Sequence, residues 1–142
     1  MKRVLIVLTF VLCLLLSTMT AWADTDLTTK EDPVNVSNYV HFREVTTGFS
    51  INSGVANCTT IAPIKSGDTV DYAQVTAYIK KSTGSTVKTF NEKVYPAAGR
   101  IIWSDSHKLA SGGTYYLQVI VKCYRNGKLI ETLNATSKTD TY

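Results

Sequence analysis

The chain has 142 residues, 44% of them hydrophobic, and its fifteen basic and eleven acidic residues give a formal charge of +4. A chain of this length can bury one hydrophobic core and is too short for two, so we expect a single domain. The basic residues are scattered and do not form the Lys/Arg stripe that binds phosphate backbones. This pattern argues against nucleic acid as a partner.

The first 23 residues have the pattern of a cleavable secretory signal peptide. Two basic residues open the segment, residues 4–16 are apolar except for one threonine, and Ala21 and Ala23 are small residues at the positions that signal peptidase reads. A membrane span would need about 20 apolar residues, but hydroxyl side chains interrupt this run. We therefore predict cleavage before Asp24, a secreted protein and no stable membrane anchor. Because the signal contains two basic and no acidic residues, its removal lowers the formal charge to +2.

Export affects the expected state of the cysteines. Cys13 lies within the apolar run and lacks the preceding small residues of a lipid-modified cysteine. Cleavage leaves Cys58 and Cys123 in a compartment where disulfides persist, and we expect them to bond to each other. Such a bond would restrict the unfolded chain by about 4 kcal/mol if its effect is entropic. The alternative is two separate buried thiols.

Composition divides the rest of the chain in two. Residues 24–41 are mostly polar and show no sustained periodicity, so they predict a flexible lead-in. Residues 42–142 contain short runs rich in Val, Ile, Thr and Tyr, separated by Gly, Ser, Asn and Asp, which predicts an all-β domain. We expect seven strands, at Arg43–Asn52, Gly54–Pro63, Asp71–Lys80, Thr86–Lys93, Gly99–Ser104, Thr114–Arg125 and Lys128–Thr136.

The dipeptide Asn126-Gly127 is the strongest turn signal, because a type I′ turn requires positive φ at both central residues. A two-residue turn there places Tyr124 opposite Leu129, and by extension Cys123 opposite Ile130 and Ile120 opposite Leu133. One face of this hairpin is then apolar and is predicted to enter the core: Tyr115, Leu117, Val119, Val121, Cys123 and Ile130.

Two features resemble immunoglobulin-like and fibronectin type III-like domains. One cysteine falls in the second predicted strand and another in the sixth, where immunoglobulin-type sandwiches join their two sheets. The run from Leu109 to Tyr115, followed by Leu117 and Val119, resembles the corner that leads into the sixth strand of such domains. The resemblance implies a seven-stranded immunoglobulin-like antiparallel sandwich in which the Tyr115 hydroxyl bonds back to the preceding turn.

The resemblance is to the sandwich and not to antibody domains themselves. An antibody domain carries its core tryptophan on the third strand, whereas Trp103 falls on the fifth. The single domain that follows a short signal is also similar to small secreted bacterial proteins of unassigned function.

No arrangement of residues predicts catalysis, a metal site or a cofactor. Asp105, Ser106 and His107 are the residue types of a hydrolytic triad, but neighbours on an extended segment project to opposite sides. His41 has only Glu44 nearby, and two close pairs of aspartates lack the glycine and distal glutamate of a calcium loop. We therefore predict a protein that is not an enzyme and takes no cofactor.

Three asparagines fit the glycan acceptor pattern, which places a hydroxyl residue two positions later: Asn35, Asn57 and Asn134. The pattern matters if the host glycosylates secreted chains. Chance occurrence in a sequence rich in Asn, Ser and Thr is the alternative.

The outward face of the last hairpin is the predicted interaction surface. It is more apolar than a solvent-exposed face usually is, and tyrosine provides large contact area at small entropic cost. The alternatives are cross-strand packing on an ordinary sheet, or cover by lead-in residues 39–42. The predicted interface residues are Tyr116, Ile120, Tyr124, Leu129 and Leu133, joined by Tyr72 and Tyr78 if the third strand pairs with the sixth.

These observations favour a secreted non-enzymatic binding or adhesion module whose partner is a protein or a glycan. One alternative is a small secreted hydrolase or inhibitor that acts through its loops. Another is a structural subunit that pairs with a second copy through an edge strand, in which case lysines could guard the edges. The candidate guards are Lys80, Lys81, Lys88, Lys128 and Lys138.

Overall fold

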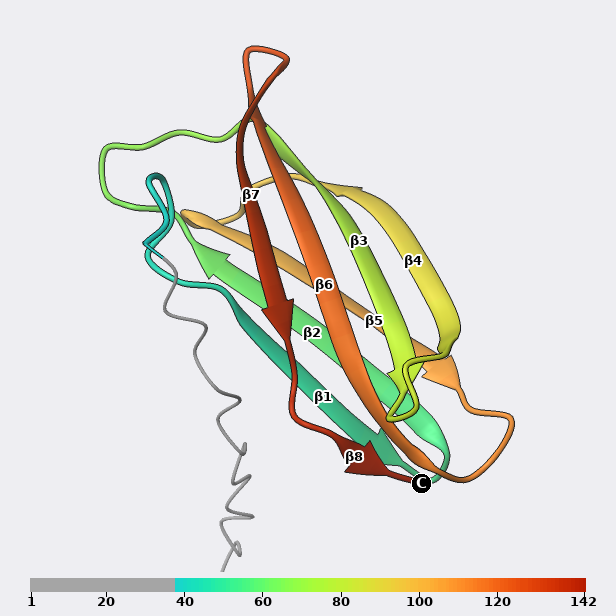
Figure 1. Ribbon diagram of the computed structural model, residues 1–142. Coiled ribbons are helices and arrows are strands. Elements are labelled where there is room, and N and C mark those ends of the chain that lie inside the picture. Colours follow the sequence, from blue (N-terminus) through green and yellow to red (C-terminus); the bar gives the residue numbers. More distant parts are fainter. Residues whose placement is uncertain (1–37) are drawn as a thin grey trace, which may run out of the picture.

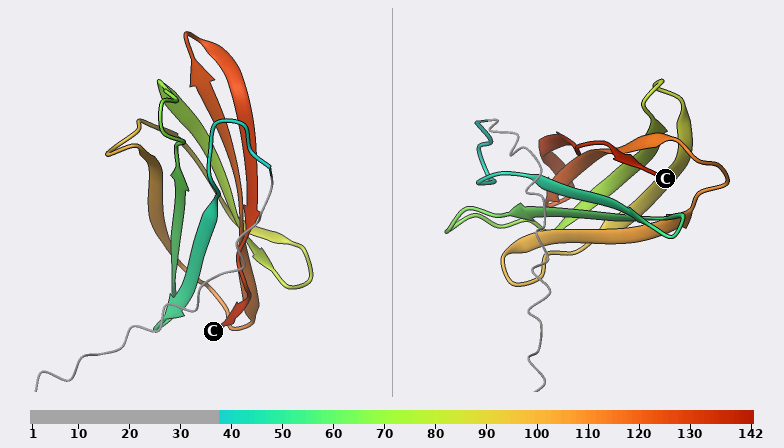
Figure 2. Two further views of the ribbon diagram at one scale, coloured as in Figure 1. Left: turned by 90° about the vertical axis from the view of Figure 1, so that its left-hand side faces the viewer. Right: turned by 90° about the horizontal axis from the view of Figure 1, so that it is seen from below.

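The computed structural model describes residues 38–142, which form two antiparallel β-sheets (Figures 1 and 2). The first sheet has the order β1-β2-β5, formed by β1 (Thr46–Asn52), β2 (Val55–Pro63) and β5 (Arg100–Lys108). The second has the order β4-β3-β6-β7, formed by β3 (Tyr72–Lys81), β4 (Thr86–Val94), β6 (Thr114–Arg125) and β7 (Lys128–Thr136). A short β8 (Asp140–Thr141) pairs with the start of β6. The predicted signal peptide and residues 24–37 of the predicted lead-in lie outside the described residues.

The all-β prediction is confirmed, and between residues 38 and 142 there is no helix. All seven predicted strands are present, and the sixth and seventh have the predicted bounds. β5 is longer than predicted, since it continues past Ser104 to Lys108. β8 was missed because two residues are too few to show a periodicity.

The core lies between the two sheets, where buried residues alternate along β2, β3, β6 and the start of β5. Phe90 and Val94 of β4 pack half-buried against them. β3 and β6 lie at the centre of the second sheet and alternate buried with half-buried positions along almost their whole length. Five of the six predicted core residues of the last hairpin are fully buried, and Ile130 packs half-buried against them. The predicted corner is also present, because the Tyr115 hydroxyl donates a hydrogen bond to the Ser111 carbonyl at 2.7 Å.

The predicted hairpin register is correct at Tyr124–Leu129 and wrong beyond it. A bulge places an extra residue in β7, so that Cys123 pairs with Glu131 instead of Ile130. Because side chains alternate with a period of two, this shift by one residue reverses the direction of every later β7 side chain. Leu133 therefore lies opposite Val121 in the core, with 0% exposure, and is not on the predicted outward face.

The expected disulfide is absent: Cys58 and Cys123 are both free and both buried. They lie at different levels along the sandwich. The start of β2 lies near the start of β6, because Tyr142 contacts Gly54 and pairs with Gly113. Cys58 is three residues from that end and Cys123 is nine, so about 20 Å of strand separates their levels at 3.3 Å per residue. A disulfide needs Cα atoms within about 7 Å.

Candidate binding surface

The outward face of the second sheet, which we call the outer face, brings six of the seven predicted interface residues together. β3 pairs with β6 so that Tyr72 lies opposite Tyr124, Thr76 opposite Ile120 and Lys80 opposite Tyr116. The residues gathered there are Tyr72, Tyr78, Tyr116, Ile120, Tyr124 and Leu129. Leu133 is not on this face, because the β7 bulge turns its side chain into the core.

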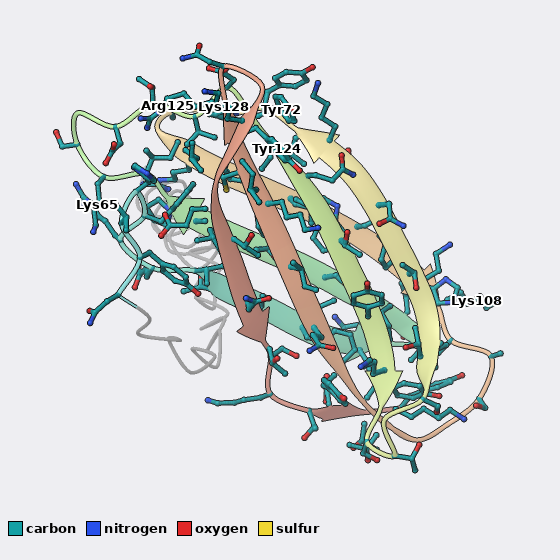
Figure 3. The ribbon with its side chains drawn as sticks, turned by 45° about the horizontal axis from the view of Figure 1, so that its top comes forward. Lys65, Tyr72, Lys108, Tyr124, Arg125 and Lys128 are labelled. Carbon is teal, nitrogen blue, oxygen red and sulfur yellow. The ribbon has the colours of Figure 1, made fainter. Side chains whose placement is uncertain are left out.

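Four side chains form a ladder across all four strands at one end of the outer face. The rings of Tyr72 and Tyr124 stack with centroids 4.8 Å apart and planes inclined by 10°, as Figure 3 shows for the neighbouring rings. The Lys93 ammonium lies 3.8 Å from the Tyr72 ring centroid, and Leu129 lies opposite Tyr124 in the register. Neighbouring side chains thus cover the faces of both tyrosine rings. This is the cross-strand packing that we gave as an alternative to an interface.

The ladder still has large exposed apolar parts. Leu129 at its β7 end is 52% exposed. Tyr95, whose ring centroid lies 5.4 Å from the Lys93 ammonium, is 63% exposed. Exposed leucine and tyrosine at the two edges of a stacked tyrosine pair, rimmed by polar groups, are the kind of surface that interfaces use.

The outer face bears positive charge and no acidic side chain. Lys93 and Lys122 lie on either side of Gln74, in one row across β4, β3 and β6. The acidic residues of β4 and β7 turn to the other side: Glu92 accepts a hydrogen bond from the Trp103 indole at 2.9 Å, and Glu131 lies opposite buried Cys123. The carboxylate of Asp71, at the rim, accepts the Asn126 N–H at 2.6 Å.

The described part of the lead-in lies along the β7 edge and leaves the ladder uncovered. The Glu131 carboxylate accepts hydrogen bonds from the N–H groups of Val40 and His41, at 2.6 and 2.9 Å. Tyr39 donates its hydroxyl to the backbone carbonyl of Asn134, and Phe42 is fully buried. These contacts place residues 39–42 at the edge and in the core, so the cover alternative does not apply to Tyr124 and Leu129.

A polar cluster beside the sandwich brings together three residues whose contact the sequence does not predict: His41, Asp68 and Arg125. Nδ1 of His41 lies 3.1 Å from the Asp68 carboxylate, and the Arg125 guanidinium lies 3.3 Å from the same oxygen. Arg125 also donates to the Thr69 carbonyl at 2.6 Å. The hydrogen bond from His41, with a further one from Arg125, lowers the pKa of the Asp68 carboxyl. The cluster pairs its own charges and ties the loop after β2 to the end of β6.

The three residues of hydrolytic type lie on β5. Asp105 and His107 lie opposite Cys58 and Ala56, whereas Ser106 lies opposite Asn57 on the other side of the strand. This is the alternation that the sequence predicted for an extended segment. The Asp105 carboxylate accepts the Ser106 N–H at 2.7 Å.

Only some of the lysines proposed to protect strand edges lie on edge strands. Lys80 and Lys81 lie on β3, which pairs on both sides, so they do not guard an edge. Lys88 and Lys128 do lie on the edge strands β4 and β7. Of the glycan acceptor sites, Asn57 and Asn134 are both exposed, and Asn35 lies outside the described residues.

Within residues 38–142 we find no helix that could cross a membrane and no group of three potential metal-ligating side chains. Comparison with models of known protein families and with curated proteins yields no match to this chain.

Proposed function

We propose that this chain is a secreted, non-enzymatic binding module that binds its partner through the outer face. Its fold is proposed to be an immunoglobulin-like or fibronectin type III-like sandwich. The strand order supports this assignment, since immunoglobulin domains also group the first, second and fifth strands against the third, sixth and seventh. The Tyr115 hydrogen bond to Ser111 supports it further.

The observation that carries the binding function is the exposed apolar surface at both edges of the ladder. Leu129 and Tyr95 remain more than half exposed beside a stacked tyrosine pair, on a sheet that the described lead-in does not cover. The sheet holds these side chains rigidly because β3 and β6, at its centre, pair along their full length. A rigid aromatic surface loses little entropy when a partner binds.

The test compares the secreted protein with the double variant Leu129→Ser/Tyr95→Ser, which removes exposed apolar surface and leaves the core intact. Both proteins are applied to a glycan array and to a panel of purified surface proteins, with gel filtration to detect self-association. The variant Ile102→Ser is the matched control, since Ile102 is 42% exposed on the opposite sheet.

We expect the wild type and Ile102→Ser to bind alike and the double variant to lose binding. If all three proteins bind equally, or if only Ile102→Ser loses binding, the outer face is not the binding surface. Circular dichroism and urea unfolding confirm that the variants are folded.

A further inference from the structure

We infer that the ligand of the outer face is an acidic polysaccharide. This inference rests on the proposed function, because it assigns a ligand class to the same surface. Three properties of the face carry it: its charge, its hydrogen-bonding groups and the covered faces of its aromatic rings.

The charge of the face is one-sided, although the chain has eleven acidic residues beside its fifteen basic ones. Lys80, Lys93 and Lys122 project from β3, β4 and β6. The carboxylates of Glu92 and Glu131 turn away from the face, and Asp71 is occupied at the rim. The outward positions of β3, β4, β6 and β7 therefore attract anions without local repulsion.

The lysines are spaced for an extended ligand and not for a single small anion. Lys93 and Lys122 sit two strands apart with Gln74 between them, which separates their Cα atoms by about 10 Å. A polymer with an anionic group on successive units could contact these ammonium groups in turn.

The remaining groups of the face suit a hydroxyl-rich ligand. Gln74 and Thr132 lie in the row next to the stacked tyrosines, and Gln118 lies opposite Tyr78. Their amides and hydroxyl suit sugar hydroxyls, which both donate and accept hydrogen bonds. An acidic protein partner would instead need a desolvated pocket for an apolar anchor. Here the stacking of Tyr72 on Tyr124 and the position of Lys93 cover the ring faces, so the two rings present mainly their edges and hydroxyls.

The experiment measures retardation of the native secreted protein in gels that contain alginate, a polyuronate, and in gels that contain neutral dextran. Polyglutamate serves as the polypeptide with the same charged group. The variant Lys93→Gln/Lys122→Gln removes two charges from the outer face. Its matched control, Arg100→Gln/Lys108→Gln, removes two charges from the opposite sheet, where Figure 3 shows Lys108 far from the ladder.

We expect alginate to retard the wild type and the control pair, with an affinity that falls as salt is added. The Lys93→Gln/Lys122→Gln variant should bind about tenfold more weakly, because each exposed ion pair contributes a factor of a few. Dextran should have no effect. Equal weakening by both pairs of substitutions would mean attraction by net charge alone and would overturn the inference. Equal binding of polyglutamate and alginate would overturn the polysaccharide class.

This inference and the proposed function fail in different ways. If a partner binds through Leu129 and Tyr95 but alginate neither retards the protein nor competes, the binding surface stands and the ligand class is wrong. If the Leu129→Ser/Tyr95→Ser variant binds every partner normally, the surface itself is wrong.

Discussion

The hydroxyl of Thr60 is buried without a hydrogen-bond partner, the single such side-chain atom among the described residues. Thr60 lies at the centre of the first sheet, between Thr47 and Trp103, with 1% exposure. Replacing its hydroxyl by a methyl group keeps the shape and removes an unpaired polar atom. We expect Thr60→Val to raise the free energy of unfolding by about 1 kcal/mol. Urea unfolding measures this. Thr59→Val, on the outward side of the same strand, should change stability by less than about 0.5 kcal/mol.

The two thiols predict a loss of stability at alkaline pH. Burial, with Asp105 beside Cys58 and Glu131 beside Cys123, raises the pKa of each thiol from 9.0 to about 12. The unfolded chain therefore releases these protons at lower pH than the folded chain does. The contribution of each thiol is complete below about pH 9 and falls between about pH 9 and 12, by at most about 1.4 kcal/mol per pH unit.

Urea unfolding at neutral pH and at about pH 10.5 tests this dependence. The variant Cys58→Ala/Cys123→Ala should show a shallower decline, because it lacks the two thiols whose pKa burial raises. The intact mass of the protein should be the same before and after reduction. A mass difference that corresponds to two hydrogens, or identical pH dependence of the two proteins, would contradict the free buried thiols.

The bulge in β7 gives two leucines of one strand opposite roles. Leu133 is fully buried against Val121, whereas Leu129 lies on the outer face and is about half exposed. Leu133→Ala should therefore lower the free energy of unfolding by about 2–5 kcal/mol, the usual cost of truncating a buried leucine. Leu129→Ala should change it by less than about 1 kcal/mol. Similar small effects of both substitutions, measured by urea unfolding, would restore the unbulged register in which both leucines face outward.

The same strand shows how far the sequence determines the elements. Alternation along β3 and β6 and the Asn126-Gly127 turn specify strand positions, because a half-buried strand and a type I′ turn each require particular residues. A bulge leaves no comparable signal, since Ile130 and Leu133 are acceptable on either face. Partners distant in sequence are equally hidden: His41 and Asp68 meet only because the loop after β2 returns to the lead-in.

The sequence predicts most of the residues on the candidate surface but not the contacts that they make there. The alternation that places Tyr72, Tyr124 and Leu129 on one side is visible in the sequence. The stacking of the rings, the position of Lys93 over Tyr72 and the turning away of Glu131 depend on strand order and on the bulge. These features change the surface from an apolar patch into a basic, hydrogen-bonding one.

At the scale of the whole molecule, the two open sides of the sandwich are closed by different means. Between β4 and β5, the Trp103 ring meets Phe90 edge to face at 5.5 Å and donates its N–H to Glu92. On the side of β1 and β7, segments near the ends of the described chain close the gap (Figure 1). Phe42 enters the core, and Asp140 of β8 accepts the Ile51 N–H at 2.8 Å.

The C-terminal segment should therefore protect an edge as well as stabilise the fold. Removal of residues 139–142 would free the Ile51 N–H, unpair the start of β6 and uncover Gly54, on which the Tyr142 ring lies. We expect the truncated protein to lose about 2 kcal/mol of stability, the value of a hydrogen bond to a carboxylate, with smaller losses from the other contacts.

Exposed strand edges pair with other chains, so gel filtration with light scattering should show dimers that increase with concentration. Asp140→Asn keeps an acceptor oxygen and the rest of β8, and should lose less stability and remain monomeric. A truncated protein that stays monomeric at every concentration would show that β1 and β6 need no cover, and that the edge of this sandwich is protected by its own twist and side chains.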